Sequence, residues 1–183
     1  MDTAPAGLPW RGPVAYAGEA LALLLAIVVI VQSLSPGGFV TAAIVGALVY
    51  CATVDLIAMR IPNVITYPGV AVVLLSATIA GLSVLGDAAL GALIGGGLIG
   101  LLVIISRGQM GMGDVKLSIL GGALVGGEYA LPALLLGSLS ALPVAGALLL
   151  TRRISRRQPI PYGPYLSLGF VVLTLLAGSV LTR

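Results

Sequence analysis

The chain has 183 residues, of which 59% are hydrophobic and 8% are charged, nine Lys or Arg against six Asp or Glu. Soluble globular domains carry about 25% charged residues, so this composition, with a mean hydropathy of +1.17, indicates that lipid surrounds most of the chain. The absence of histidine excludes His-based catalytic triads and His-ligated metal centres. The single cysteine, Cys51, excludes an intramolecular disulfide and a Cys-x-x-Cys redox pair.

Seven apolar stretches follow one another along the chain, and each is predicted to span the bilayer, for which a helix needs about 20 residues. We read the first as a span rather than a signal peptide, because no small-residue cleavage site follows it. The sequence thus predicts an all-α polytopic bundle over residues 16–183, preceded by a short segment, 1–15. The spans are 16–35, 38–59, 64–83, 88–106, 113–127, 129–151 and 162–182, separated by turns such as Pro36-Gly37-Gly38, Ile61-Pro62-Asn63 and Leu85-Gly86-Asp87.

The basic residues predict the orientation of the bundle, since positively charged loops stay in the cytoplasm. With the N-terminus inside, only Arg183 of the nine basic residues lies outside, and Asp87 and Glu128 become caps on the outer side. The basic run 152–157 is then read as an anchor on anionic lipid rather than as a substrate-binding patch. We expect a multi-pass protein of the cytoplasmic (inner) membrane, with the lipid bilayer and not nucleic acid as its partner; its oligomeric state stays open. The basic residues predicted on the inner side are Arg11, Arg60, Arg107, Lys116, Arg152, Arg153, Arg156 and Arg157.

The fifth span is short, since its residues, 113–127, reach only about 22 Å as a helix. Either it begins below the interface or the loop before it dips into the membrane, and irregular backbone at that depth needs cover from protein or water. We therefore expect a shielded pocket at its inner end, although a thinned bilayer would also fit. Small residues at i and i+4, Gly91 with Gly95, Gly96 with Gly100 and Gly122 with Gly126, predict close helix packing.

Two aspartates stand out, because ionisable residues inside spans are costly and mark function by default. Asp55 follows 35 residues without a charge and lies five residues before Arg60, which is about 7 Å along a helix axis. Asp114 opens the fifth span, and because the chain crosses the bilayer twice between them, both lie on the same side. Structural alternatives exist for each: Asp114 as a helix N-cap, and Asp55 as a snorkelling side chain or one paired with Arg60.

Two carboxylates that face one water suffice for peptide hydrolysis without a metal or a nucleophile. One, ionised, deprotonates the water, and the other, protonated, donates to the carbonyl oxygen, while repulsion between them keeps one shared proton. Gly111 and Gly113 beside Asp114 allow positive φ and the close approach of a substrate backbone. We expect no metal, because Mg²⁺ or Ca²⁺ prefers more oxygen ligands than two aspartates offer, and no other cofactor.

Three motifs resemble the type IV prepilin peptidases, which are intramembrane aspartic proteases of the Gly-x-Gly-Asp class. The stretch from Asp55 to Gly69, DLIAMRIPNVITYPG, is similar to their first aspartate motif; the stretch from Gly111 to Leu117, GMGDVKL, to their Gly-x-Gly-Asp motif; and the stretch from Pro161 to Gly169, PYGPYLSLG, to the start of their last span. The motifs occur in the family's order and are specific in combination. The resemblance implies Asp55 and Asp114 as the catalytic pair, and Arg60, Pro62, Asn63 and Lys116 match other motif positions, where Arg60 and Lys116 either support the site or anchor helix ends.

The resemblance also implies the substrate, a prepilin or pilin-like pseudopilin whose short basic leader is cut after a glycine at the cytoplasmic membrane face. The associated processes are type IV pilus assembly and protein secretion. Many bacterial members carry a further span and a cytosolic insert with paired cysteines, which are linked to N-methylation of the new N-terminus. Because Cys51 is the only cysteine and about 15 residues precede the first span, we expect no methyl transfer.

Two other functions compete with proteolysis. The same acids in a polytopic bundle could serve a proton- or cation-coupled transporter, against which stand the lack of an inverted repeat and the position of both acids near one face. The chain could also be a non-catalytic subunit of a pilus or secretion machine, with Asp114 as a cap only. The effect of replacing either aspartate distinguishes these three hypotheses: peptidase, transporter and non-catalytic subunit.

Overall fold

A computed structural model describes residues 11–106, 110–150 and 161–183. Residues 1–10, Arg107 and the basic run 152–157, on which the orientation argument partly rests, lie outside these ranges. The described residues form seven helices, and five of them are long and apolar enough to cross a membrane, which confirms the polytopic all-α bundle. The helices are α1 (Arg11–Gln32), α2 (Pro36–Ala58), α3 (Asn63–Ala80), α4 (Leu82–Ile105), α5 (Met112–Val125), α6 (Gly127–Leu150) and α7 (Gly163–Ala177).

Two predicted turns differ from the structure in instructive ways. At the first, Ser35 is an N-cap whose Oγ accepts a hydrogen bond from the Gly38 N–H at 3.0 Å, so Pro36 and Gly37 already belong to α2. The predicted turn Leu85-Gly86-Asp87 is wrong, because these residues lie inside α4. Gly81 makes the turn instead, with φ of 137°, a conformation that only glycine adopts readily.

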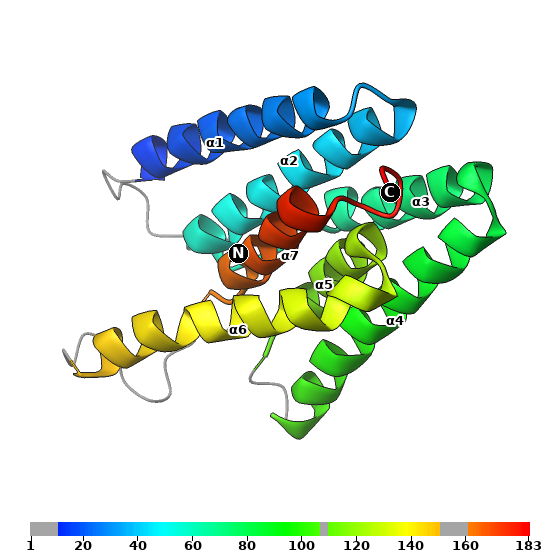
Figure 1. The fold of residues 1–183 in the computed structure, drawn as a ribbon. Helices are drawn as coiled ribbons and strands as arrows, with labels where there is room; N and C mark the ends of the chain where they lie inside the picture. The colour runs from blue at the N-terminus through cyan, green and yellow to red at the C-terminus, as the bar shows by residue number, and fades with distance from the viewer. Residues whose placement is uncertain (1–10, 107–109, 151–160) are drawn as a thin grey trace.

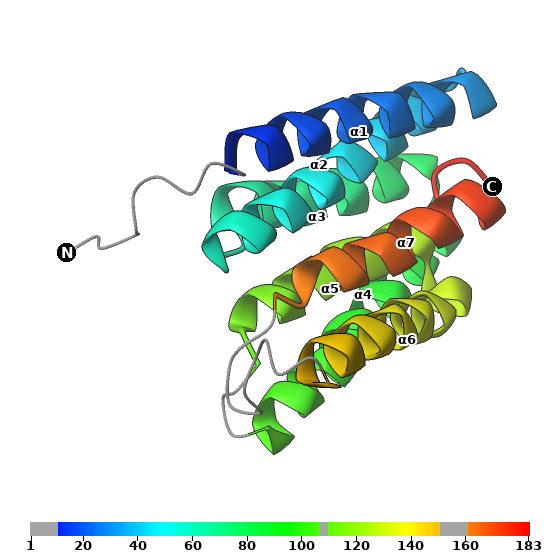
Figure 2. The ribbon, with the colours of Figure 1, turned by 90° about the vertical axis from the view of Figure 1, so that its left-hand side faces the viewer.

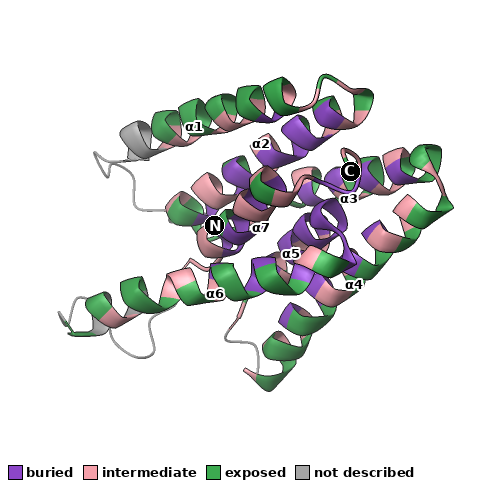
Figure 3. Ribbon diagram, in the orientation of Figure 1, coloured by how far each residue is buried: buried purple, intermediate pink, exposed green. Residues whose placement is uncertain are grey.

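Helix α5 lies at the centre of the bundle, where α3, α4, α6 and α7 surround it (Figure 1, Figure 2). Most of α5 is buried (Figure 3), and its residues Leu117, Leu120, Ala123, Leu124 and Val125 have no exposed surface. At 14 residues it is about 21 Å long. The short fifth span is therefore covered by protein, as predicted, because other helices enclose it.

The predicted small-residue pairs allow α4 and α5 to pack with their backbones in contact. A Cβ added at Gly91 would overlap the carbonyl oxygen of Gly122, one at Gly95 would overlap that of Ser118, and one at Gly96 would overlap the Ile119 side chain. Gly100 makes only an ordinary contact, 3.8 Å from Val115. Gly126 does not serve as a packing residue within α5, because it ends the helix with φ of 83°.

The end of the bundle at which α5 finishes is held by hydrogen bonds to helix termini. Asp87 Oδ1 accepts from the Gly127 N–H at 2.8 Å and so caps α6, which agrees with its predicted role as a cap; Glu128 lies in the first turn of α6. The guanidinium of Arg183 donates to the carbonyl of Val125 and lies 4.5 Å from the centre of the Tyr129 ring. The C-terminus thus closes the end opposite to the two aspartates.

We expect Gly95→Ala to destabilise the protein by about 1 to 3 kcal/mol, because the new methyl group has no room beside Ser118. Gly97→Ala on the same helix is the matched control, since nothing lies within 4 Å of a Cβ there. Thermal unfolding in detergent measures both variants. Equal midpoints would contradict the close approach of α4 and α5.

Candidate functional site

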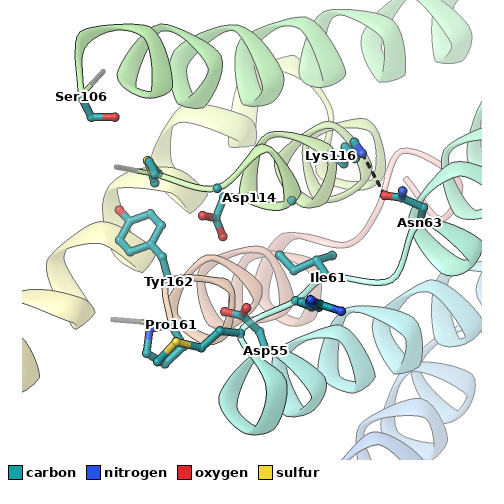
Figure 4. A pocket seen from close by; sticks show the side chains of 13 residues that line it. Asp55, Ile61, Asn63, Ser106, Asp114, Lys116, Pro161 and Tyr162 are labelled. Carbon is teal, nitrogen blue, oxygen red and sulfur yellow. Dashed lines mark hydrogen bonds between the residues drawn. The ribbon is translucent and has the colours of Figure 1, made fainter. Parts of the chain in front are cut away.

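A pocket of about 780 Å³ opens at the end of the bundle where α2 and α4 finish and α3, α5 and α7 begin. It contains both predicted aspartates (Figure 4). The segments that line it are far apart in the sequence, so the fold gathers them at one level. The lining residues are Asp55, Met59, Arg60, Ile61, Asn63, Ser106, Met110, Gly111, Gly113, Asp114, Lys116, Pro161 and Tyr162.

Asp55 lies in the last turn of α2 and is 6% exposed. The helix ends directly after it, because Met59 adopts a left-handed conformation with φ of 50° and donates its N–H to the Asp55 carbonyl at 2.8 Å. The side chain takes its hydrogen bond from α7: the Gly163 N–H donates to Asp55 Oδ2 at 3.0 Å. Asp55 is thus held by the start of the last helix, and not by Arg60 as one alternative supposed.

Asp114 is the third residue of α5 and is 7% exposed. The alternative that it is the N-cap is wrong, since Gly111 occupies that position and its carbonyl accepts from the Asp114 N–H at 3.1 Å. The carboxylate still benefits from the positive end of the helix dipole.

The two carboxylates face each other across the pocket (Figure 4). One comes from the end of α2 and the other from the start of α5. The structure therefore brings together the two acids that the sequence places 59 positions apart. Both acids of the pair are almost fully buried and line one pocket.

The two glycines beside Asp114 do not use the positive φ that glycine allows. Gly111 has φ of −77° and Gly113 lies within α5. A Cβ at Gly113 would lie 3.0 Å from the Cβ of Ile61. Gly113 therefore lets the start of α5 approach the connection between α2 and α3, which carries Ile61.

Three of the four other motif residues, Arg60, Asn63 and Lys116, line the pocket, and Pro62 lies directly before Asn63. Lys116 Nζ donates to Asn63 Oδ1 at 2.9 Å and lies 5.0 Å from the centre of the Tyr67 ring, so it ties α5 to the first turn of α3 (Figure 4). Pro62 occupies the N-cap position of α3, and its carbonyl accepts from the Ile65 N–H at 3.2 Å. Arg60 is exposed at the pocket rim.

Sequence reasoning missed Tyr162 and Gly163 as parts of the site. Gly163 holds Asp55, and the Tyr162 hydroxyl donates to Ser138 Oγ at 2.7 Å, which fixes the ring at the side of the pocket opposite to Lys116 (Figure 4). Their signal was present in the Pro161-Tyr162-Gly163-Pro164 motif, which was interpreted only as the start of a helix. In the described ranges, His, Cys, Asp and Glu side chains nowhere gather in groups of three or more that could hold a metal.

Comparisons with known proteins agree on one family. Residues 42–146 match the family model described as the type IV leader peptidase family. The prepilin leader peptidase/N-methyltransferase of Aeromonas salmonicida strain A449 is 36% identical over 173 residues, which cover 90% of this chain and 58% of the relative. The Aeromonas hydrophila protein of the same name is also 36% identical over 173 residues, covering 90% of this chain and 59% of that protein.

A more distant relative, the prepilin leader peptidase/N-methyltransferase of Bacillus subtilis strain 168, is 29% identical over 93 residues, or 51% of this chain and 38% of that protein. The chain thus spans a little under three fifths of the length of the Aeromonas relatives. No solved structure gives a significant match.

Removal of the hydrogen bond between Lys116 and Asn63 is expected to lower the free energy of unfolding by about 0.5 to 1 kcal/mol. The effect is small because the contact is exposed to solvent. A double-mutant cycle with Lys116→Met and Asn63→Ala isolates the pair from other losses. We expect the double variant to lose less stability in thermal unfolding than the two single losses added together. Strict additivity would contradict the link between α5 and α3.

Proposed function

The chain belongs to the type IV leader peptidase family, and from that premise we propose that it is an intramembrane aspartic endopeptidase that removes the leader of prepilins or pilin-like proteins. The observation that carries the proposal is the pair of buried carboxylates, Asp55 and Asp114, in one pocket. The name of the Aeromonas and Bacillus relatives describes both a leader peptidase and an N-methyltransferase. The proposal for this chain concerns peptide cleavage.

Hydrolysis by the pair needs one water and one shared proton. The ionised carboxylate takes a proton from the water, whose oxygen then attacks the carbonyl carbon of the scissile bond. The protonated carboxylate donates to the carbonyl oxygen, which gives a tetrahedral intermediate without a formal negative charge. When the carbon–nitrogen bond breaks, the leaving nitrogen takes the proton that the first carboxylate had accepted. The shared proton then returns from the intermediate to the dyad.

The position of Asp55 supports this chemistry, because catalysis depends on how well the reacting groups are oriented. The bond from the Gly163 N–H to Oδ2 at 3.0 Å fixes the plane of the carboxylate and leaves Oδ1 for a water in the pocket. On the other side, the rigid first turn of α5 carries Asp114.

The substrate we propose has a short basic leader, a glycine and then an apolar helix. The pocket lies at one end of the bundle. In a substrate whose apolar helix spans the membrane, the peptide bond between the leader and this helix would lie at the membrane surface, at the level of the aspartates. Arg60 and Lys116 lie at this end, and the excess of Lys and Arg supports its assignment to the cytoplasmic side of the inner membrane. We also propose that cleavage occurs without methyl transfer.

We predict that Asp55→Asn and Asp114→Asn each abolish cleavage, with a loss of about a thousandfold or more, since neither acid is able to fill both roles. Asp87→Asn, at the opposite end of the bundle, is the matched control and should cleave at the wild-type rate. The measurement is mass spectrometry of a prepilin-like substrate after incubation with purified protein.

The same spectrum tests the finer claims. A product that begins directly after the glycine and carries no methyl group is expected. Normal cleavage by a folded Asp55 or Asp114 variant would overturn the catalytic assignment, and a methylated product would overturn the restriction to cleavage.

We expect Gly163→Ala to reduce kcat about tenfold to a hundredfold, because a Cβ there would lie 2.8 Å from Asp55 Oδ2 and would displace the carboxylate. Gly97→Ala, where a Cβ has no neighbour within 4 Å, controls for the added methyl group. Cleavage rates at saturating substrate measure the effect. An unchanged kcat in Gly163→Ala would mean that the contact with α7 does not orient Asp55.

A further inference from the structure

Tyr162 lies between two hollows of the molecule. Its ring lines the aspartate pocket, and it also lines an apolar groove of about 360 Å³ between α6 and α7. We call this second hollow the α6–α7 groove. Its other main lining residues are Leu135, Leu139, Ala141, Leu142 and Tyr165.

The α6–α7 groove presents leucines outward from the bundle. Leu135, Leu139 and Leu142 are 54%, 60% and 64% exposed, and their spacing of four and three residues puts them on one face of α6. Tyr162 lies beside this face, because its hydroxyl donates to Ser138 Oγ on α6. An apolar chain on this face would therefore lie against Tyr162, whose ring also lines the aspartate pocket.

The two helices beneath the groove are packed closely enough to form a fixed floor. A Cβ at Gly169 of α7 would overlap the carbonyl oxygen of Ala133 in α6, and a Cβ at Gly137 would lie 2.6 Å from the carbonyl oxygen of Tyr165. These contacts also show that α6 and α7 run antiparallel. Because the Tyr162 hydroxyl meets Ser138, Leu135 lies farther than Tyr162 from the start of α7, whereas Leu142 lies on the other side of it, toward the last turns of α6.

A larger apolar groove, of about 780 Å³, lies between α1 and α2 but is badly placed to serve the aspartates. Its lining residues on α2 include Gly46, Tyr50, Thr53 and Ile57, which at 100° per residue share one face of the helix. Asp55 points about 160° away from that face by the same spacing. A segment in this groove would be separated from the aspartate pocket by α2 itself.

We propose that the α6–α7 groove binds the apolar segment of the substrate that follows the scissile bond, with Tyr162 as the residue over which the chain passes to the aspartates. The inference rests on the proposed function. The occupant is identified by continuity, because Tyr162 belongs to both hollows, and by chemistry, because a chain cut beside the dyad and entering the membrane must place apolar side chains next to it.

Disulfide cross-linking tests the groove without requiring cleavage. The probe is a synthetic peptide with a short basic leader, a glycine and an apolar segment of about 20 residues, carrying one cysteine on the third residue after the glycine. Each protein variant carries Asp114→Asn, to prevent cleavage, and one introduced cysteine: Leu139→Cys in the groove, Leu75→Cys on α3, or Leu23→Cys in the groove between α1 and α2. The three leucines are 60%, 64% and 67% exposed, and the parent variant with only the buried Cys51 gives the background.

We expect the cross-linked fraction at Leu139→Cys to exceed that at the other two positions about fivefold or more. Equal fractions, or a larger one at Leu23→Cys, would overturn the groove assignment. Incubation of the same peptide with the chain that retains Asp114 distinguishes a failure of the groove assignment from a failure of the proposed function. Cleavage without preferential cross-linking at Leu139→Cys would support the peptidase function and overturn the groove assignment. Preferential cross-linking without cleavage would support the groove assignment and overturn the peptidase function.

Discussion

The high cost of a carboxylate inside a bilayer is the constraint on which this structure depends. An acid at that depth persists only where protein, water or a partner group compensates it, and this chain keeps two acids close together. Asp55 receives a hydrogen bond from Gly163, and Asp114 lies at the positive end of α5. Both open onto a pocket rather than onto lipid. The rest of the bundle is arranged to make that environment possible.

The environment is produced by enclosing a short helix within longer ones. Because Gly91, Gly95 and Gly122 bring the backbones of α4 and α5 into contact, α5 reaches the centre of the bundle and its first turn is surrounded by helix ends. The glycines of α4 and α5 thus make room for the short helix that carries Asp114.

Much of this arrangement follows from the sequence. Apolar stretches of sufficient length predicted the helices, and the two crossings between Asp55 and Asp114 predicted that they lie at one end. Other features depend on tertiary contacts. The turn at Gly81 was missed because Gly86 and Asp87 look like turn residues, although Asp87 lies within α4 and caps α6 across 40 positions. The motif around Gly163 is visible in the sequence, but it does not predict that the Gly163 N–H donates to Asp55, which lies 108 positions earlier.

The arrangement also separates chemistry from recognition. The two acids that we propose act on the peptide bond come from α2 and α5, whereas the surface that we assign to the apolar part of the substrate comes from α6 and α7, with Tyr162 between them. One rigid segment, the start of α7, thus serves both regions: Gly163 orients an acid, and Tyr162 borders the groove.

The central claim is that Asp55 and Asp114 act on one water molecule. It is tested most directly by an experimental structure of the chain bound to a peptide in which a hydroxyl-bearing carbon replaces the scissile carbonyl. The account predicts that this hydroxyl lies within hydrogen-bond distance, about 2.6 to 3.2 Å, of a carboxylate oxygen of both aspartates. A hydroxyl bound to one aspartate alone, with the other turned away, would contradict it.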